Sequence, residues 1–354
     1  MTADMRSFLR VSIDELSALI QPLSPGPDQS GYLSGTYQLR DTAGRVLLSS
    51  VIEPGDTDAG MLVEALGSWR LLSTIADDNA SISADHILPG CSAEDIPRFN
   101  ARFACALSRW RDRAHGMKPF AVFHQAAHLR AVIVTPSSSL WPTTINDLAH
   151  GSPLALWVRG DVSVVPRVRR SISLVGARAA SNYGTHVALE SAAGMSDRGF
   201  AIVSGCAFGI DAAAHRAALA SEQVTIAILA GGIDRLYPAG NSELLHRICE
   251  TGALIAEMAP GFAPTRWRFL MRNRIIAAAS RATIVIEAGY RSGSLNTAGH
   301  AVEIGRPLGA VPGSVLSPES AGCHRLIREY GAVLVTNIDD MVELADPLGH
   351  ERES

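Results

Sequence analysis

Two hydrophobic patterns divide the chain at about Arg170. Beyond this point, apolar runs of strand length alternate with segments whose apolar residues recur at helical spacing. The strand-like runs lie at 171–177, 200–205, 224–232, 253–259, 282–289, 308–313 and 332–336. The helical segments lie between these runs, and a last one lies at 339–345. Continuous apolar runs separated by helices are typical of a parallel sheet covered on both faces, so we expect an α/β fold with a doubly wound, mostly parallel Rossmann-like sheet.

The residues before Arg170 follow a weaker pattern. Apolar residues at helical spacing predict helices at 61–77 and 96–114, whereas the Pro, Gly and Ser residues of 21–35 predict a loop. Short apolar runs predict strands at 119–123, 130–136 and 152–161.

These patterns predict a division of the chain into four parts. The expected parts are a smaller, mainly helical N-terminal region at 1–115, for which SAM and helix-hairpin-helix types are candidates; a connecting segment at 116–165 with short strands that pack on the main domain; a Rossmann-like domain at 166–340; and a polar tail at 341–354.

Composition indicates a soluble, cytoplasmic protein. Of the 354 residues, 47% are apolar and 19% are charged. The first 25 residues carry Asp4, Asp14 and Glu15 and no long apolar run, which argues against a signal peptide or a membrane span. The five cysteines are scattered and form no CxxC pair, as expected for a reduced protein without a zinc ribbon. We therefore expect no metal, no cofactor and no membrane partner.

The net charge of −4 conceals an asymmetry. Residues 166–330 contain 17 arginines and 12 acids, whereas the remainder contains 14 basic and 23 acidic residues. The excess is sharpest at 266–291, where six arginines face one acid, Glu287. Charges beside a buried strand are unfavourable unless they are paired. Either acids elsewhere in the chain pair with these arginines, or an anionic ligand binds them.

The turns that follow the predicted strands are where a ligand is expected. In an open α/β sheet, ligands bind beyond the carboxyl ends of the strands, where backbone amides at helix starts attract anions. Small and hydroxyl residues with flanking arginines occur repeatedly there, which favours a ligand with several phosphates. The candidates for binding are Arg178, Ser204, Gly205, Gly209, Arg272, Arg274, Arg291, Ser292, Gly293 and Ser294.

Three acids near these turns are candidates for a supporting role. Asp211 is either an N-cap or first-turn acid of a helix or a partner of His215, four residues on. For that pair we favour a structural hydrogen bond over a metal or acid–base role, because no third ligand lies at a suitable spacing. Glu257 and Glu287 end strand-like runs, and we favour a role in positioning Arg272 or Arg274 over a catalytic one. A dinucleotide site is not indicated because the first turn lacks GxGxxG, and no GxxxxGK[ST] motif indicates an ATPase.

Six segments in unbroken order resemble the DNA-processing protein A family, also called DprA or Smf. The resemblance covers roughly residues 166–336, and its most specific parts are SGxAxGID, RNRIIA and SGSL. The segments are SLVGARAASNYG, IVSGCAFGIDAAAHRAAL, TIAILAGGIDRLYPAGNSEL, ALIAEMAPG, RNRIIAAASRATIVIEAGYRSGSLNTA and VPGSVLSPESAGCHRLIREYGAVLV.

The resemblance implies a cytoplasmic protein that binds and protects single-stranded DNA. It also implies that the protein helps to load the RecA recombinase in natural transformation (competence) or homologous recombination, forms a homodimer and is not an enzyme. The family's DNA-binding positions correspond to Arg178, the loop from Ser204 to Gly209, the RNR motif of Arg272, Asn273 and Arg274, and the turn from Arg291 to Ser294.

The chain departs from the family pattern at two points. Phe208 stands where the family usually has a basic residue, which removes one phosphate contact but offers a ring for stacking on a base. Many members also continue into a winged-helix-like module, whereas this chain stops soon after residue 340.

Two other functions compete with DNA binding. A nucleotide-binding enzyme, such as a nucleoside-monophosphate phosphoribohydrolase on a related fold, would use PGGxGTxxE with a catalytic glutamate. The corresponding turn here has Asn296 and Thr297 where the acid would be needed, which argues against catalysis. The second competitor is a scaffold whose site is vestigial, and the arginine excess at 266–291 argues against it.

Overall fold

The computed structural model describes residues 4–25, 35–88, 90 and 92–346. It divides into two compact units, which are described separately. The first unit comprises Met1–Ser139, Ala149–Trp157 and Glu257–Pro260, and the second comprises Leu140–Leu148, Val158–Ala256 and Gly261–Ser354. In the described part of the chain, no helix is both long enough and apolar enough to cross a membrane.

The first unit is mainly helical, as the sequence predicts. The expected helix at 96–114 is present as α7, whereas the expected helix at 61–77 is interrupted at Gly67, whose φ of 82° ends α4 and begins α5. The helices are α1 (Met5–Phe8), α2 (Ile13–Ile20), α3 (Thr36–Val51), α4 (Thr57–Leu66), α5 (Ser68–Ala76), α6 (Ala84–Ile87), α7 (Ile96–Ala114) and α8 (Pro119–His128). Most of the expected loop at 21–35 lies outside the described residues.

The strand expected at 119–123 is wrong, because this segment begins helix α8. Proline is tolerated in the first turn of a helix, where its missing N–H has no intrahelical acceptor, so Pro119 does not oppose the helix. Phe123 and Ala126 are buried three residues apart on one helix face. A short apolar run alone does not distinguish this pattern from a strand. The other two expected strands are present as β1 (Val132–Val134) and β2 (Leu156–Gly160).

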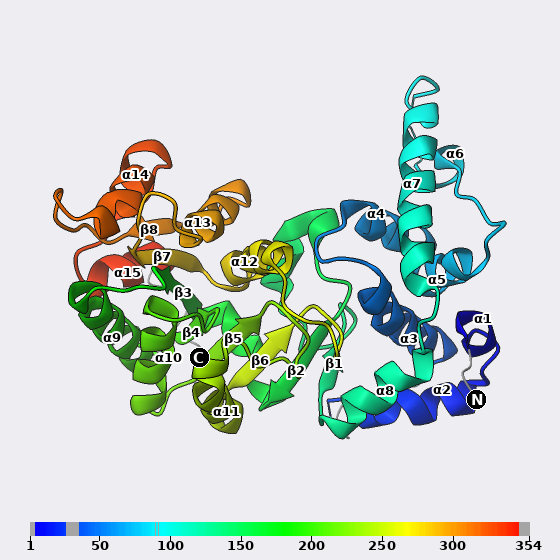
Figure 1. The fold of residues 1–354 in the computed structure, drawn as a ribbon, viewed down its shortest axis with the longest axis horizontal. Helices are drawn as coiled ribbons and strands as arrows, with labels where there is room; N and C mark the ends of the chain where they lie inside the picture. The colour runs from blue at the N-terminus through cyan, green and yellow to red at the C-terminus, as the bar shows by residue number, and fades with distance from the viewer. Residues whose placement is uncertain (1–3, 26–34, 89, 91, 347–354) are drawn as a thin grey trace. The chain divides into compact units, whose positions relative to one another are not determined.

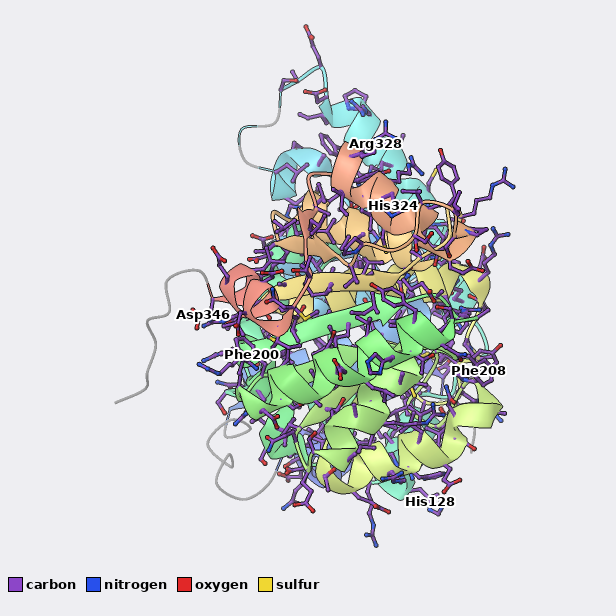
Figure 2. The ribbon with its side chains drawn as sticks, turned by 90° about the vertical axis from the view of Figure 1, so that its left-hand side faces the viewer. His128, Phe200, Phe208, His324, Arg328 and Asp346 are labelled. Carbon is purple, nitrogen blue, oxygen red and sulfur yellow. The ribbon has the colours of Figure 1, made fainter. Side chains whose placement is uncertain are left out.

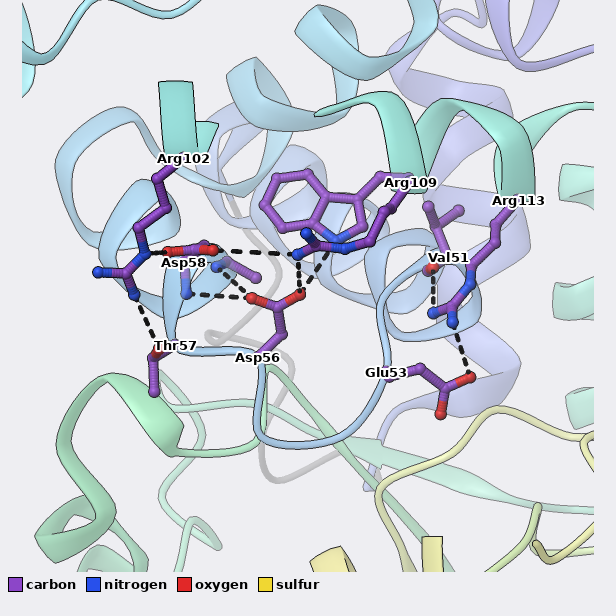
Figure 3. A network of polar contacts seen from close by, with 10 residues as sticks. Val51, Glu53, Asp56, Thr57, Asp58, Arg102, Arg109 and Arg113 are labelled. Carbon is purple, nitrogen blue, oxygen red and sulfur yellow. Dashed lines mark hydrogen bonds and ion pairs between the residues drawn. The ribbon is translucent and has the colours of Figure 1, made fainter. Parts of the chain in front are cut away.

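Arginines of α7 pair with acids at the start of α4, within the first unit (Figure 3). Arg102 pairs with Asp58, and Arg109 lies 3.5 Å from Asp56. Asp56 also caps α4, since its carboxylate accepts hydrogen bonds from the N–H groups of Asp58 and Ala59. This helix start is therefore already occupied by a carboxylate of the same chain.

The second unit contains a parallel sheet covered by helices on both faces, which confirms the predicted Rossmann-like α/β fold. The strands lie in the order β6-β5-β4-β3-β7-β8-β9, and neighbouring strands run parallel. Their bounds are β3 (Ser171–Gly176), β4 (Ala201–Ser204), β5 (Thr225–Leu229), β6 (Ala253–Ala256), β7 (Ala282–Glu287), β8 (Leu308–Ala310) and β9 (Val333–Leu334).

Helices connect these strands at the positions that the sequence predicts. Figure 1 shows α9, α10 and α11 on one face of the sheet and α12, α13 and α14 on the other. Their bounds, with that of the last helix, are α9 (Asn182–Asp197), α10 (Ile210–Ala220), α11 (Ser242–Thr251), α12 (Arg266–Ala279), α13 (Ser294–Glu303), α14 (Ala321–Glu329) and α15 (Ile338–Ala345). Residues 341–345 of the expected polar tail belong to α15, and residues 347–354 lie outside the described residues.

The core of the second unit packs around β3, the central strand at which the strand order reverses. Ile172 and Leu174 of β3, Ile202 of β4 and Ile284 of β7 are fully buried against apolar residues of α9 and α10. From β3 the chain proceeds through β4, β5 and β6 toward one edge and then returns to β7, on the other side of β3. This reversal leaves room at the carboxyl ends of β3 and β7, because the helices that follow the two strands lie on opposite faces.

Candidate functional site

A cleft of about 1120 Å³ opens at the carboxyl edge of the sheet, in the second unit. It lies at the switch in strand order, and its walls are the turns after β3 and β7 and the first part of α12. Ligands of open α/β sheets bind at this kind of position. The predicted binding residues that line the cleft are Arg178, Arg272, Asn273, Arg291, Ser292, Gly293 and Ser294, together with the supporting Asp211.

The turn after β3 is held by an internal carboxylate. Glu287 accepts hydrogen bonds from both the backbone N–H, at 2.8 Å, and the hydroxyl of Ser181, the residue that caps α9. A Cβ on Gly184 would lie 2.5 Å from this carboxylate, so glycine is required there. The expectation that Glu287 pairs with Arg272 or Arg274 is therefore wrong, because its two oxygens bind Ser181 and satisfy the start of α9. Glu257, the other acid that was expected to position these arginines, is half-buried just after β6 and lies outside the residues that line the cleft.

The turn after β4 is also held by an internal acid. Asp211, in the first turn of α10, accepts hydrogen bonds from the N–H groups of Gly205 and Ala207 at 3.2 and 3.3 Å. The hydroxyl of Ser204 donates to the carbonyl of Leu174 at 2.6 Å. Gly209 has a φ of 76°, and a Cβ there would lie 2.2 Å from the carbonyl oxygen of Ala177. This loop is therefore held by Asp211, which is a first-turn acid of α10, as one of the expected alternatives had it; the N-cap of α10 is Gly209.

Arg272 lines the cleft but is almost fully buried. Its guanidinium donates to the carbonyl oxygens of Gly205, at 2.9 Å, and Ile228, and the residue is only 6% exposed. Burial lowers the pKa of Arg272 to about 10, and nearby Asp211 opposes this shift, so the guanidinium stays charged at neutral pH. Burial also raises the pKa of the Asp211 carboxyl, which Arg272 opposes. Arg274 is buried as well, and the RNR arginines therefore form part of the protein interior.

The turn after β7 differs from the first two because no acid occupies its helix start in the described structure. Ser292 and Ser294 share a hydrogen bond of 2.8 Å between their hydroxyls, and α13 begins at Ser294 without a side-chain cap or an acid in its first turn. Nothing lies within 4 Å of a Cβ placed on Gly293, so the backbone is open there. Asn273 donates to the Asn296 side chain at 3.1 Å and so connects α12 to this turn. The first N–H groups of α13 donate within the turn, from Ser294 to the Ser292 hydroxyl at 3.4 Å, from Leu295 to the Ser292 carbonyl at 3.2 Å and from Asn296 to the Gly293 carbonyl at 3.1 Å. This helix start therefore carries no acid, but its donors have partners in the chain.

Three exposed arginines surround the cleft. Arg178, Arg266 and Arg291 line it, and no acid in the described part of the chain forms an ion pair with any of them. With Arg272, the lining contains four arginines against two acids, Asp211 and Glu319. The excess of positive charge in the sequence is therefore concentrated at an open surface, where it attracts an anion.

Aromatic rings accompany these arginines. The guanidinium of Arg178 lies 5.3 Å from the centroid of the Phe269 ring, and the Tyr237 ring lies 5.5 Å from the same ring. Tyr237 is 49% exposed. Phe208, labelled in Figure 2, is 48% exposed. It lies against Gly240, outside the residues that line the cleft.

Some of the predicted binding and supporting residues lie outside the lining of the cleft, and the lining includes residues that the sequence did not single out. The predicted residues that do not line it are Ser204, Gly205, Phe208, Gly209, Arg274, Glu257 and Glu287. The lining residues that were not predicted include Arg266 and Tyr237. Arg266 was within the region of arginine excess, and Tyr237 follows the third strand-like run, so position relative to a strand end was the signal available.

His215 does not complete a metal site with Asp211. Its Nδ1 lies 2.7 Å from the Thr225 hydroxyl, which itself donates to the Ile202 carbonyl, so the histidine ring is the donor to Thr225. Burial lowers the pKa of His215 to about 3, which keeps the ring neutral. Over the described residues, no group of three or more His, Cys, Asp and Glu side chains is arranged to hold a metal ion.

The fold and the cleft define a class: Rossmann-like proteins with a cationic, aromatic-lined site at the switch in strand order. Residues 132–346 match the family model for DNA recombination-mediator protein A, and the chain belongs to this family. The prediction from the sequence motifs is confirmed in this respect.

Relatives in several bacteria support the assignment. A DprA protein of Mycobacterium tuberculosis H37Rv is 50% identical over 227 residues, which cover 61% of this chain and 58% of that protein. DprA of Streptococcus pneumoniae R6 is 37% identical over 231 residues, covering 65% of this chain and 77% of that protein. The match thus spans less than two thirds of the mycobacterial relative.

Two solved structures of DprA proteins share the fold. The structure of DprA from Streptococcus pneumoniae superposes with a TM-score of 0.65 at 28% identity and covers 87% of this chain and 97% of that chain. DprA from Helicobacter pylori, whose structure was described for its single-stranded DNA binding mode, superposes with a TM-score of 0.55 at 26% identity, covering 61% and 95% of the two chains.

Proposed function

We propose that this protein binds single-stranded DNA in the cleft at the carboxyl edge of its sheet. The observation that carries the proposal is the set of exposed arginines, Arg178, Arg266 and Arg291, which no described acid pairs with. A polyanion is the ligand that such a surface attracts. The description of the Helicobacter pylori relative as a single-stranded DNA-binding protein supports the same ligand.

The proposed contacts divide between phosphates and bases. Phosphate oxygens accept hydrogen bonds from Arg178 and Arg291 and approach the exposed backbone at Gly293, where the first turn of α13 carries no acid. Bases stack on the exposed rings of Tyr237 and Phe208. Because these contacts do not read the edges of bases, the sequence preference of binding is expected to be weak.

The buried arginines act differently in this proposal. Arg272 keeps the loop at Gly205 in place and adds positive charge to the lining of the cleft, rather than forming the outer phosphate contacts. Arg272 and Asp211 are buried charges of opposite sign that stabilise each other. Removing one of two such charges leaves the other uncompensated, which destabilises the fold strongly. Substitution of Arg272 would therefore change folding as well as binding, and exposed arginines make the better test.

We further propose that the protein protects single-stranded DNA and promotes loading of the RecA recombinase, in natural transformation or homologous recombination. The family description, a recombination mediator, supports this role. The proposal includes a homodimer that works in the cytoplasm and has no catalytic activity of its own.

The first test compares wild type with the double variant Arg178→Ala/Arg291→Ala. Fluorescence anisotropy with a labelled single-stranded oligonucleotide and its duplex, at several salt concentrations, measures the affinity. We expect preference for the single strand and a loss of affinity of roughly 100-fold or more in the variant, since it removes two arginines and a hydrogen bond to a charged group contributes about 1.5–3 kcal/mol. The dependence on salt should also weaken, because each lost phosphate contact lowers the logarithmic slope by about 0.7.

The matched control is Arg247→Ala, which removes an exposed arginine of α11 that does not line the cleft. Its affinity should stay within about twofold of wild type, the range expected for a single distant charge. Equal losses in the two variants would mean that the cleft is not the site. Absence of binding by wild type at low salt would reject DNA binding, and hydrolysis of nucleoside monophosphates would then be assayed.

A further inference from the structure

An apolar loop tip lies between β8 and α14. Val315 is 86% exposed and Leu316 is 90% exposed, and they are the most exposed large hydrophobic residues in the described part of the chain. Single exposed apolar residues are common in soluble proteins. Two adjacent aliphatic side chains that are almost fully in water are less usual and favour a contact with a partner that covers them.

The loop is fixed at its base. The hydroxyl of Tyr183, on α9, donates to the Pro312 carbonyl at 2.7 Å, and the His324 ring, on α14, lies 3.1 Å from the Gly313 carbonyl. A Cβ on Gly313 would lie 2.0 Å from the hydroxyl oxygen of Ser320, so the backbone is packed tightly there.

The tip itself is turned by local hydrogen bonds. The N–H of Leu316 donates to the Ser314 hydroxyl at 3.2 Å, and the N–H of Ser317 donates to the Ser314 carbonyl at 3.0 Å. Together with the fixed base, these bonds determine where the two aliphatic side chains project. A preformed tip binds at a lower entropic cost than a loop that must first be ordered.

The loop is also adjacent to the cleft. Pro318 and Glu319, which follow the tip, line the cleft. A Cβ on Gly289, in the turn after β7, would lie 3.6 Å from the Pro318 carbonyl oxygen, and the N–H of Gly322 donates to the Ala288 carbonyl at 2.7 Å. The tip therefore lies next to the turn that contains Arg291 and the start of α13.

The surroundings of the tip suit a nucleic acid. Tyr290, in the same turn as Arg291, is 60% exposed, and the guanidinium of Arg325 lies 5.0 Å from its ring centroid. The acids nearby are Glu319 and Glu329, of which Glu329 pairs with Arg325. An aromatic ring and an arginine thus lie in or beside the turn that contains Arg291.

We propose that Val315 and Leu316 form an apolar wedge that contacts the bases of the strand whose phosphates bind in the cleft. The inference rests on the proposed function, because it requires single-stranded DNA in the cleft. Aliphatic side chains insert between bases in other nucleic-acid complexes, and such contact is tolerant of sequence because every base has an apolar face. The contact adds affinity that does not depend on salt, unlike the arginine contacts.

The test compares wild type with Val315→Ser/Leu316→Ser. Both residues are at the surface, so the variant is expected to remain folded. Binding is measured by anisotropy over a range of salt concentrations, and base unstacking is measured by the fluorescence of 2-aminopurine in the oligonucleotide. We expect affinity to fall by roughly 5- to 50-fold at every salt concentration, with an unchanged salt slope and a smaller fluorescence change.

The matched control is Leu189→Ser/Val302→Ser, which makes the same kind of change on exposed residues of α9 and α13 outside the cleft lining. It should bind as wild type does. If wild type binds single strands and the tip variant binds them equally well, the wedge is rejected while the proposed function stands. If the tip variant keeps its DNA affinity but loses binding to purified RecA, the tip contacts protein instead. If wild type binds no single strand, both proposals fail.

Discussion

At the scale of single residues, exposure distinguishes two kinds of arginine around the cleft. Arg272 and Arg274 are 6% and 3% exposed, whereas Arg178 and Arg291 are at the surface. The same residue type therefore has two roles, one in holding the loop at Gly205 and one, as proposed, in binding phosphate. Sequence spacing alone does not separate these roles, because both kinds of arginine flank strands.

Gly205 provides a test of the role of Arg272. A Cβ at residue 205 would lie 2.3 Å from a guanidinium nitrogen of Arg272, so Gly205→Ala displaces either the arginine or the loop. We expect a loss of about 1–3 kcal/mol in the free energy of unfolding, as overpacking of an interior causes. Denaturant unfolding measures it.

Gly299→Ala is the control for this prediction. Gly299 lies within α13, and nothing is within 4 Å of its added Cβ. Alanine favours a helix by about 0.8–1 kcal/mol over glycine, so this variant should be as stable as wild type or more stable. An unchanged stability of Gly205→Ala would show that the loop adapts without cost.

At the scale of an element, α10 carries a buried ionisable group on its inner face. His215 is fully buried and its pKa is lowered to about 3 by burial, with Arg272 and Arg216 adding to the shift. The unfolded chain binds a proton at the ordinary histidine pKa of about 6.5, whereas the folded chain does not. The stability contributed by neutral His215 is thus complete above about pH 6.5 and is lost as pH falls toward 3.

This linkage predicts a measurable pH dependence. Between pH 7 and pH 5, His215 should lower the free energy of unfolding of wild type by about 2 kcal/mol, from the ordinary histidine pKa. His215→Gln removes this group, and its stability should decline less over the same interval, whatever its stability at pH 7. Denaturant unfolding at a series of pH values compares the two slopes. Identical slopes would mean that His215 is protonated in the folded protein or is not buried.

Helix α7 differs from the cleft because three of its arginines, Arg102, Arg109 and Arg113, form ion pairs with acids. Arg102 pairs with Asp58, whose side chain is 11% exposed, and Arg113 lies 3.4 Å from Glu53, whose side chain is 25% exposed. Burial raises the pKa of Asp58, and Arg102 opposes that shift. These three positive charges are therefore compensated by acids of the first unit.

We predict that Arg102→Ala destabilises the protein more than Arg113→Ala does. Removing Arg102 leaves a more buried carboxylate without its partner, which should cost about 1 kcal/mol or more, against a few tenths for the exposed pair. Thermal unfolding measures the order of the two variants. Neither should change affinity for single-stranded DNA beyond about twofold, since each arginine is compensated by an acid partner and does not line the cleft. A large loss of affinity in either variant would place part of the DNA site on α7.

At the scale of the whole molecule, topology brings together residues that are far apart in the sequence. Arg178 follows β3 and Arg291 follows β7, more than a hundred residues later, yet both line one cleft because β3 and β7 are neighbours in the sheet. This arrangement brings part of the arginine excess of residues 166–330 to one surface. The net charge of −4 would oppose binding of a polyanion, whereas the local excess at the cleft favours it.

The amino-acid sequence by itself determined the class of fold, the order of strands and helices after residue 170, and the family. These depend on local periodicity and on motifs, which are properties of consecutive residues. The error at 119–123 arose where a short apolar run suits either a strand or a helix and only packing decides.

Only the tertiary structure decided which charged residues remain available to a ligand. Glu287 binds Ser181 rather than an arginine, Asp211 closes the loop at Gly205, and Arg272 is almost fully buried. The physical reason is that pairing and burial depend on distances between segments remote in the sequence. Whether a charge is compensated by the protein or left for a ligand is settled when those segments pack together.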